Sequence, residues 1–384
     1  MRQATPNPRR KSALLLGGGG ARAAYQVGVL KAVSELTDSN QTNPFPIICG
    51  TSAGSINALA LASFAYDFQH GVNQIVNVWS NFKVAMVFRV DAKNLAFRII
   101  RWTWSNLGFG RSNKGPTSIL DNNPLRHLLG ATINLNRIQQ SLSEGQLHAY
   151  CVTACSYTTG ESTTFYDGHE SVKPWHRTHR DGRRSTITLD HLMASSAIPV
   201  LFPSVQIGNE HYGDGSMRQG SPISPALHLG ADKILIIGLR LERPDSAPPI
   251  SPPPPSLGQI SGYVMDTLFL NSLRADLERL ERINRTLKRN ISDKRVEDGT
   301  NELKVIEHLL ISPSEDIANI AQKYYNDLPK SFRIALKFLG MKRGNSRRLI
   351  SYLMFTKRFC QELIELGYRD AMVQREEIIE FIES

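Results

Sequence analysis

Cysteine and long apolar runs are both scarce in this sequence. Four cysteines among 384 residues are too few for a disulfide framework, so a reducing, cytoplasmic compartment is expected. No apolar run approaches the roughly 20 residues that cross a bilayer, so any membrane contact is expected to be peripheral. Residues 1–11 are polar and basic and lack the apolar core of a secretory signal. They are predicted to form a mobile basic arm.

Acidic residues are fewer than basic ones. The chain contains 45 Lys and Arg against 35 Asp and Glu, which leaves a net charge of +10. A basic surface suits an anionic partner, either nucleic acid or anionic lipid headgroups, and composition alone does not choose between them. The hydrophobic content of 41% and the charged content of 21% are typical of a globular protein and exclude a disordered chain.

The stretch around Ser52 predicts a strand, a sharp turn and a helix. Three apolar residues (47–49) run into the sequence GTSAG, and an Ala- and Leu-rich segment follows. Gly50 and Gly54 flank the serine at the G-x-S-x-G spacing that places a nucleophile on a strand-to-helix elbow. Small residues are needed because strand and helix crowd together there, and the strained turn pushes the hydroxyl outward. The alternative is an ordinary turn in which the serine or its neighbour caps the helix.

A run of four glycines, Gly17 to Gly20, follows an earlier apolar strand predicted at 13–16. A helix is predicted after it, over residues 23–36, from apolar positions at helical spacing. Three functions are typical of a glycine-rich turn between a strand and a helix. The first, a P-loop, is excluded because no Gly-Lys-Ser/Thr follows the glycines.

The other two functions are dinucleotide binding and an oxyanion hole. Gly18, Gly20 and Ala23 fit the dinucleotide fingerprint G-x-G-x-x-G/A. The acidic partner that this fingerprint requires, Asp38, lies in a turn and not at the end of a second strand. That second strand instead leads to Ser52. Acyl transfer from a serine needs backbone N–H groups aimed at the developing oxyanion, so an oxyanion hole is the favoured interpretation.

A serine hydroxyl needs a neighbouring base to act as a nucleophile. The usual base is a histidine oriented by an acid, and the chain contains ten histidines. His211 and His228 come nearest to an expected end of the sheet. Asp214 lies between two glycines after a strand-like run and is the best-placed carboxylate, although an ordinary hairpin turn would also explain this segment. The residues alone leave the choice of base open.

Four motifs between Ser12 and Ala231 together resemble the patatin-like phospholipase family. They occur in the order typical of that family, which is more specific than any single motif. Two small residues depart from the family pattern, Ala23 in place of a glycine and Ser216 in place of glycine or alanine. The motifs are Gly18-Gly19-Gly20-Ala21-Arg22, Gly50-Thr51-Ser52-Ala53-Gly54, Ala194-Ser195-Ser196-Ala197-Ile198-Pro199 with Phe202-Pro203, and Asp214-Gly215-Ser216.

The resemblance implies a Ser–Asp dyad without histidine, in which Ser52 attacks an ester and Asp214 serves as the base. It also implies an α/β protein with a three-layer α/β/α fold and a mostly parallel central sheet. No metal, organic cofactor or nucleic-acid partner is expected. The implied oxyanion hole consists of Gly18, Gly19 and Gly20. The residues that support the motifs are Arg22, Gly50, Gly54 and Gly215.

The resemblance stops near a proline-rich segment. Residues 12–240 are expected to form the patatin-like catalytic domain, residues 241–256 a proline-rich linker, and residues 257–384 a mainly helical C-terminal region. Lys233–Leu239 is expected to be the last strand of the main sheet. Residues 304–312 are a candidate for one further strand.

Three other segments are candidates for a functional role. The aromatic and basic residues of 83–110 fit either a lid on a lipid surface or a pair of core helices. Residues 330–367 fit a helical cap, which is expected, or a membrane-facing patch. Residues 175–184 are predicted to be a solvated basic loop and not a zinc site, although His176 and His179 are at metal-like spacing.

The expected function is a serine esterase or lipid acyl hydrolase. It would cleave fatty-acyl esters of phospholipids or lysophospholipids through an acyl-Ser52 intermediate that water resolves, in peripheral contact with an anionic membrane surface. The alternatives are an acyltransferase that uses the same intermediate, a nucleotide-binding oxidoreductase, and an inactive lipid- or nucleic-acid-binding member of the fold. The oligomeric state, the headgroup and the acyl position are not predicted.

Overall fold

The central sheet is built on short apolar strands. The computed structural model describes residues 10–37, 43–90, 118–241, 254, 256–290, 303–338 and 346–384. Within these residues, five parallel strands lie in the order β10-β9-β1-β2-β3, and all but β10 are buried along their whole length. Such continuous apolar runs are typical of parallel strands covered by helices on both sides. The strands are β1 (Ser12–Leu16), β2 (Ile47–Thr51), β3 (Ala149–Ser156), β9 (Lys233–Ile237) and β10 (Glu307–Ile311).

The other half of the sheet contains mainly antiparallel pairs. The basic segment 175–184, expected to be a loop, instead forms strands β5 and β6, which pair with each other. Trp175 lies over Gly182 and stacks on Tyr166, with 5.1 Å between ring centroids, and this buried contact holds the charged strands on the sheet. The strands are β4 (Ser162–Gly168), β5 (Trp175–Arg177), β6 (Arg180–Arg184), β7 (Val205–Ile207) and β8 (Glu210–Asp214).

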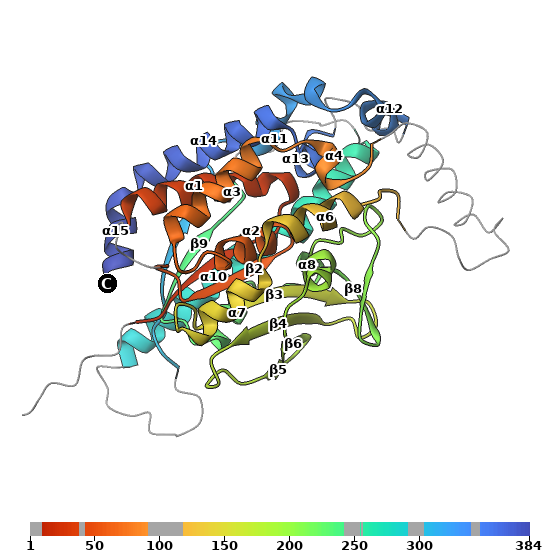
Figure 1. Ribbon diagram of the computed structural model, residues 1–384. Helices are drawn as coiled ribbons and strands as arrows, with labels where there is room; N and C mark the ends of the chain where they lie inside the picture. Colours follow the sequence, from red (N-terminus) through yellow and green to blue (C-terminus); the bar gives the residue numbers. More distant parts are fainter. Residues whose placement is uncertain are drawn as a thin grey trace, which may run out of the picture.

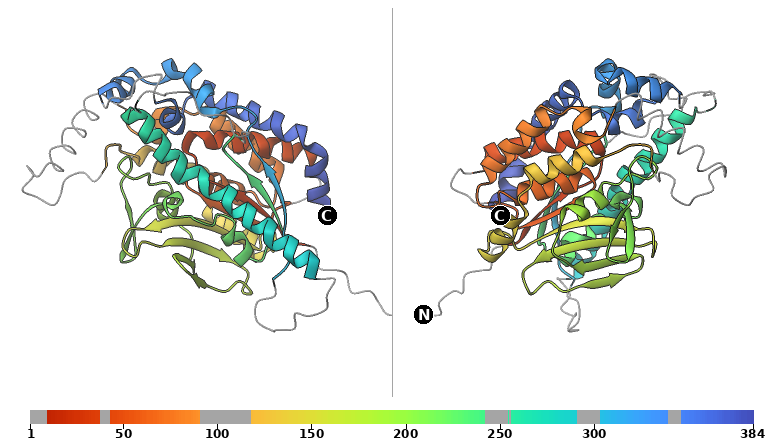
Figure 2. Two further views of the ribbon diagram at one scale, coloured as in Figure 1. Left: turned by 180° about the vertical axis from the view of Figure 1, so that it is seen from behind. Right: turned by 45° about the vertical axis from the view of Figure 1, so that its right-hand side comes forward.

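Alternating side chains of β1 face two layers of helices. Leu14 and Leu16 contribute to the larger core, whereas Ala13 and Leu15 contribute to a second core on the opposite face. Helices α1 and α3 cover one face together with α14 (Figure 1), and α10 crosses the other face diagonally (Figure 2). The expected three-layer fold is confirmed. The main helices are α1 (Ala24–Leu36), α2 (Ala53–Ala62), α3 (Phe68–Ser80), α9 (Ser224–His228), α10 (Leu257–Asn290) and α14 (Lys357–Val373).

Elements after the proline-rich segment join the same sheet and the same core. β10 pairs in parallel with β9, with Glu307 opposite Lys233, so the expectation that 233–239 is the last strand of the main sheet is wrong. β9 would otherwise present an unpaired edge, and β10 satisfies its backbone groups. The remaining elements are η1 (Gly20–Ala23), α4 (Val84–Val87), α6 (Asn123–Thr132), α7 (Leu135–Ser143), α8 (Leu189–Ser195), η2 (Gly215–Met217), α11 (Ile317–Lys323), η3 (Tyr325–Asp327), α12 (Lys330–Phe338), α13 (Arg347–Leu353) and α15 (Arg375–Glu383).

The segment 83–110 is described only as far as residue 90. Val87 and Phe88 of this part are buried in the main core. Residues 91–110, which carry most of the aromatic and basic side chains on which the lid interpretation depends, lie outside the described residues. So do residues 1–9 of the basic arm.

Most of the linker, residues 242–253 and 255, also lies outside the described residues. In the segment 330–367, Phe332 and Leu349 are buried in the main core, which favours the helical cap over the membrane-facing patch. None of the described helices combines the length and the apolar character that crossing a bilayer requires.

The contact between α1 and α14 depends on two glycines. A methyl group at Gly28 would lie 2.0 Å from the carbonyl oxygen of Ile364, and one at Gly367 would lie 2.2 Å from that of Tyr25. We predict that Gly28→Ala lowers the free energy of unfolding by about 1–3 kcal/mol, measured by urea denaturation, because the helices must move apart. Gly220→Ala is the control, since a methyl group there meets nothing within 4 Å. Equal stability of the two variants would contradict the close helix contact.

Candidate active site

Ser52 lies on a strained turn between β2 and α2. Its φ of 53° and ψ of −130° lie outside the usual regions for a residue with a side chain. The flanking glycines allow this turn. A methyl group at Gly54 would lie 2.2 Å from the carbonyl oxygen of Leu16, and one at Gly50 would lie 2.4 Å from the Cα of Ser55. The structure therefore shows the strand-to-helix elbow expected from the G-x-S-x-G spacing.

Ser195 fixes the backbone of this elbow. The N–H of Ser52 donates to the Ser195 Oγ at 2.8 Å, and that hydroxyl donates to the carbonyl oxygen of Thr153 at 2.6 Å. Both groups are buried. The chain therefore ties the elbow to β3 through a side chain for which the sequence suggested no individual role. Its place within the Ala194–Pro199 motif was the available signal.

Asp214 reaches Ser52 because two strands share one edge of β3. The other edge of β3 is occupied by β4. On the shared edge, β2 pairs with Ala149–Thr153 and β8 pairs with Ala154–Ser156. The two strands therefore lie end to end. β2 stops where the chain turns at Ser52, and β8 continues along the same edge with Asp214 opposite Ala154. The Ser52 Oγ donates to the Asp214 Oδ2 at 2.6 Å.

The Asp214 carboxyl group is fully buried. Burial raises its pKa to about 7, and hydrogen bonds from the Ser52 hydroxyl and from Ser216 oppose this rise. The Ser216 N–H donates to the Asp214 Oδ1 at 2.9 Å. Gly215 must lack a side chain, because a methyl group there would lie 2.1 Å from the carbonyl oxygen of Thr153. A carboxyl group with this pKa can take up and return a proton near neutral pH.

No histidine completes a triad. All ten histidines lie in the described residues, and none hydrogen-bonds to Ser52 or Asp214. His211 is exposed on β8. His228 stacks on Trp175 with 4.6 Å between ring centroids, and burial together with nearby arginines lowers its pKa to about 4. The two histidines that are alternative candidates for the base therefore do not hydrogen-bond to Ser52 or Asp214.

The glycine-rich loop lies beside Ser52. A methyl group at Gly18 would come within 2.9 Å of the Ser52 Cβ, so only glycine allows the loop this close. In the described part of the chain, the backbone N–H groups of Gly18 and Gly19 have no acceptor. Gly20 has a φ of +54° and borders the same cavity as Ser52. The loop can therefore offer N–H groups to an oxyanion formed at Ser52.

Arg22 is not part of this group of residues, although it belongs to the same motif. Its guanidinium points to the C-terminal helices, where Nε donates to the Ser351 Oγ at 2.7 Å. No cluster of three or more His, Cys, Asp and Glu side chains suited to a metal ion occurs among the residues that the structure describes.

A cavity of about 260 Å³ extends from Ser52 along α2. Ser52, Ile56 and Ala60 line it at intervals of four residues and therefore mark one face of that helix. The other walls come from α3, α6 and the segments around Ile198 and Phe355. Most of the side chains that line the cavity are apolar, so it suits an aliphatic chain. They include Phe64, Ile75, Val78, Trp79, Phe82, Leu125, Leu128, Leu129 and Phe202.

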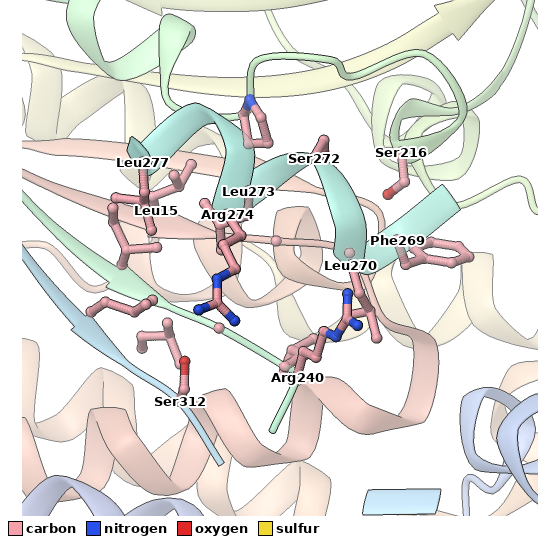
Figure 3. Close-up of a pocket in the computed structure, with 18 of the residues that line it drawn as sticks. Leu15, Ser216, Arg240, Phe269, Leu270, Ser272, Leu273, Arg274, Leu277 and Ser312 are labelled. Atoms are coloured by element: carbon pink, nitrogen blue, oxygen red, sulfur yellow. The ribbon is translucent and has the colours of Figure 1, made fainter. Parts of the chain in front are cut away.

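A second, smaller cavity of about 70 Å³ lies on the other side of the loop, bordered by Gly17 and Gly18. Arg240, which follows β9, and Arg274 of α10 extend into it (Figure 3), and both are exposed. The floor is apolar and includes Leu15. This cavity combines guanidinium groups with an apolar surface.

An elbow serine whose partner is an aspartate, with no histidine between them, distinguishes one class of α/β/α protein from the Ser-His-Asp hydrolases. The chain belongs to the patatin-like phospholipase family, because the sequence model of that family matches residues 14–227, more than half of the chain. The matched segment contains all four motifs and ends before β9. Membership supports lipid acyl hydrolase activity in general and an enzyme as opposed to a binding protein.

The solved structures that match this chain have low sequence identity to it. VipD from Legionella pneumophila is 12% identical, with a TM-score of 0.38 and coverage of 96% of this chain and 67% of VipD. Human GIVD cytosolic phospholipase A2 is 11% identical, with a TM-score of 0.47 and coverage of 100% of this chain and 61% of the human chain. The chain thus spans about three fifths to two thirds of these proteins. No curated protein matches it in sequence.

The raised pKa of Asp214 predicts a pH-dependent cost in stability. In the unfolded chain this group ionises near its ordinary pKa of 3.8, whereas the folded protein holds the proton until about pH 7. The contribution of protonated Asp214 to the free energy of unfolding is therefore fully present below the unfolded pKa. It is lost as the pH rises through the folded pKa of about 7. The variant Asp214→Asn does not undergo this loss. The melting temperature of the variant minus that of wild type should therefore increase between pH 4.5 and 7 and then level off.

Asp370→Asn is the control for this measurement, because Asp370 is also a buried carboxylate but lies on α14, away from the site. A melting-temperature difference for Asp214→Asn that does not change with pH would contradict the raised pKa.

Proposed function

We propose that the chain is a lipid acyl hydrolase in which Ser52 is the nucleophile and Asp214 is the base. The observation that carries this proposal is the 2.6 Å hydrogen bond from the Ser52 Oγ to the buried Asp214 Oδ2. It occurs on a strained elbow beside the glycine-rich loop, so the proposed nucleophile, base and oxyanion donors lie close together. Gly18, Gly19 and Gly20 are the proposed oxyanion donors.

The proposed reaction has two steps. The Ser52 Oγ attacks the ester carbonyl carbon and its proton passes to Asp214, while the loop N–H groups bind the oxyanion. The ester C–O bond breaks, and the departing alcohol takes the proton from Asp214. Water then attacks the acyl carbon and gives a proton to Asp214. That proton returns to the Ser52 Oγ as the fatty acid leaves.

The cavity along α2 is the proposed site for the acyl chain. It begins at Ser52 and its lining is largely apolar, so an aliphatic chain bound there would be removed from water. The carbonyl carbon of that chain would lie at the serine. These features support fatty-acyl esters as substrates.

The arginines of the smaller cavity support a phospholipid or lysophospholipid over a neutral ester. Arg240 and Arg274 lie beside the loop that borders Ser52, and guanidinium groups bind phosphate through paired hydrogen bonds. The net charge of +10 also suits an anionic membrane surface. We propose peripheral contact with such a surface.

Replacing either dyad residue tests the proposed mechanism. We predict that Ser52→Ala and Asp214→Asn each lower kcat/KM by roughly 10³-fold or more, because the nucleophile or its base is lost. Fatty-acid release from a panel of phospholipids and lysophospholipids is the measurement. Wild-type kcat/KM should rise as Asp214 loses its proton, with a midpoint near pH 7.

Two buried residues away from the dyad are matched controls, Ser63→Ala at the end of α2 and Asp370→Asn on α14. Both should retain activity. Substantial activity in folded Asp214→Asn would contradict Asp214 as the base. If acyl transfer to an added lysolipid exceeds fatty-acid release, the enzyme is an acyltransferase that uses the same dyad.

Chain-length preference tests the acyl cavity. Ala60 lies eight residues after Ser52, which is about 12 Å along the helix at 1.5 Å per residue. We predict that Ala60→Phe reduces hydrolysis of p-nitrophenyl palmitate at least tenfold and leaves p-nitrophenyl butyrate within about twofold, because only the long chain reaches this position. Asn73→Phe, on an exposed position of α3, is the control. Equal effects on both esters would exclude this cavity as the acyl site.

A further inference from the structure

The cationic side chain of Arg22 joins the glycine-rich loop to helices that lie outside the family-matched segment. The side chain is buried, with 4% of its surface exposed. Its Nε donates to the Ser351 Oγ at 2.7 Å, and its Nη2 donates to the carbonyl oxygen of Arg348 at 3.3 Å. Both acceptors lie on α13. The loop is therefore bonded to the C-terminal region within a few residues of Gly18, Gly19 and Gly20.

Asp266 of α10 neutralises this buried cation. Its Oδ1 lies 3.2 Å from the Arg22 Nη2, and of the carboxylates in the described ranges only Asp266 pairs with Arg22. A buried arginine without a counter-charge is strongly unfavourable, because little water remains to solvate it. The position of Arg22, and of the loop that carries it, therefore depends on α10.

Tyr352 of α13 contacts the loop in two ways. Its ring covers the Arg22 guanidinium, with 3.9 Å from the Cζ to the ring centroid, and its hydroxyl donates to the Asp266 Oδ1 at 2.8 Å. Its backbone adjoins Gly20, where a methyl group would lie 2.3 Å from the Tyr352 carbonyl oxygen. One residue thus orients both the arginine and its partner and limits where the loop can lie.

Phe269 supports the loop from a second position on α10, three residues after Asp266. A methyl group at Gly18 would lie 2.9 Å from the Phe269 Cδ1 and 2.9 Å from the Ser52 Cβ. Figure 3 shows Phe269 beside Ser216, at the end of the smaller cavity. The glycine-rich loop is therefore held between the Ser52 elbow and the C-terminal helices.

We propose that Asp266 and Tyr352 are positioning residues for catalysis, which hold the oxyanion loop in place through Arg22. This inference rests on the proposed function, in which the loop N–H groups stabilise the oxyanion. Such donors act only when they are aimed at the developing charge, so a shift of the loop weakens them without changing the nucleophile. The inference also gives residues 257–384 a role, which is to complete the active site.

The expected effect falls on kcat. Neither Asp266 nor Tyr352 lines the acyl cavity, so KM for a short soluble ester should stay within about twofold of wild type. Removal of one oxyanion donor typically lowers kcat by about 10²–10³-fold. A misaimed loop keeps its donors, so we expect a fall in kcat of about 10- to 100-fold for Asp266→Asn and a smaller fall for Tyr352→Phe.

The experiment uses the full chain with p-nitrophenyl butyrate as substrate. Asp266→Asn and Tyr352→Phe are compared with Asp327→Asn and Tyr324→Phe, respectively. Asp327 has a similar exposure and forms an ion pair with Arg358 at 3.4 Å, and the Tyr324 hydroxyl donates to Glu362 at 3.3 Å. The control pairs lie in the same region but do not contact the loop. For each variant kcat, KM and the melting temperature are measured.

A double-mutant cycle tests whether Asp266 acts through Arg22. If it does, Arg22→Gln combined with Asp266→Asn should have a kcat no lower than that of Arg22→Gln alone, because the second change then affects a partner that is already absent. The kcat of the double variant should also be higher than that of Asp266→Asn, since the double variant contains no unpaired buried arginine. If the fold-losses in kcat of the two single variants multiply in the double variant, Asp266 does not act through Arg22.

Amide hydrogen exchange of Arg22 and Ala24, whose N–H groups donate to the carbonyl oxygens of Gly19 and Ala21, provides a readout that does not depend on activity. It should be faster in Asp266→Asn and Tyr352→Phe than in wild type and in both controls. Unchanged exchange, or kcat within about twofold of wild type in both variants, would overturn the inference. The inference would also be overturned if the control variants lose kcat as well, and if the loss in every variant follows the decrease in its melting temperature.

A fluorophosphonate probe distinguishes a failure of this inference from a failure of the proposed function. If wild type is labelled at Ser52 and hydrolyses the ester, the proposed function stands whatever the Asp266 variant does. If wild type is neither labelled nor active, the proposed function fails, and hydrogen exchange still decides whether Asp266 and Tyr352 hold the loop.

Discussion

The site depends on one edge of β3, which two strands share end to end. β2 leaves this edge where the chain turns at Ser52, and β8 continues along it as far as Asp214. The serine and the carboxylate therefore meet because one strand stops where the other begins. Glycines shortly after both strands permit this contact, since side chains at Gly54 or Gly215 would collide with backbone carbonyl groups. A slip in the pairing of either strand would separate the two groups.

Burial gives this contact its chemical character. Asp214 has no exposed surface, and an ionised carboxylate in such a place is unfavourable unless its oxygens accept hydrogen bonds. The Ser52 hydroxyl and the Ser216 N–H supply two such bonds, but burial remains the larger influence on the pKa. The protein thus carries at neutral pH a carboxyl group that is costly to ionise, at the point where a base is proposed to act. Stability and the proposed activity therefore make opposite demands on this residue.

The sequence predicts local features well and long-range ones poorly. The elbow at Ser52 and the turn after β1 depend on glycines within a few residues, so spacing alone indicates them. The first helix and the strand before the linker follow from apolar periodicity. By contrast, β10 pairs with a strand about 70 residues away in sequence, and the β5–β6 hairpin depends on Trp175 lying over Gly182. The partner of Arg22 and the cavity along α2 form only when helices from distant segments pack together. The four motifs indicated which residues would gather, but not how β3 brings them together.

The contacts of Arg22 have a consequence for the order in which the molecule becomes complete. The glycine-rich loop is synthesised before Asp266 and Tyr352, which are made after every motif of the matched family segment. A nascent chain that has already formed the elbow and β8 still lacks the counter-charge for the buried Arg22. The loop can reach its final conformation only after α13 has emerged. Biosynthesis therefore separates the appearance of the serine and the aspartate from the completion of the surface that faces them.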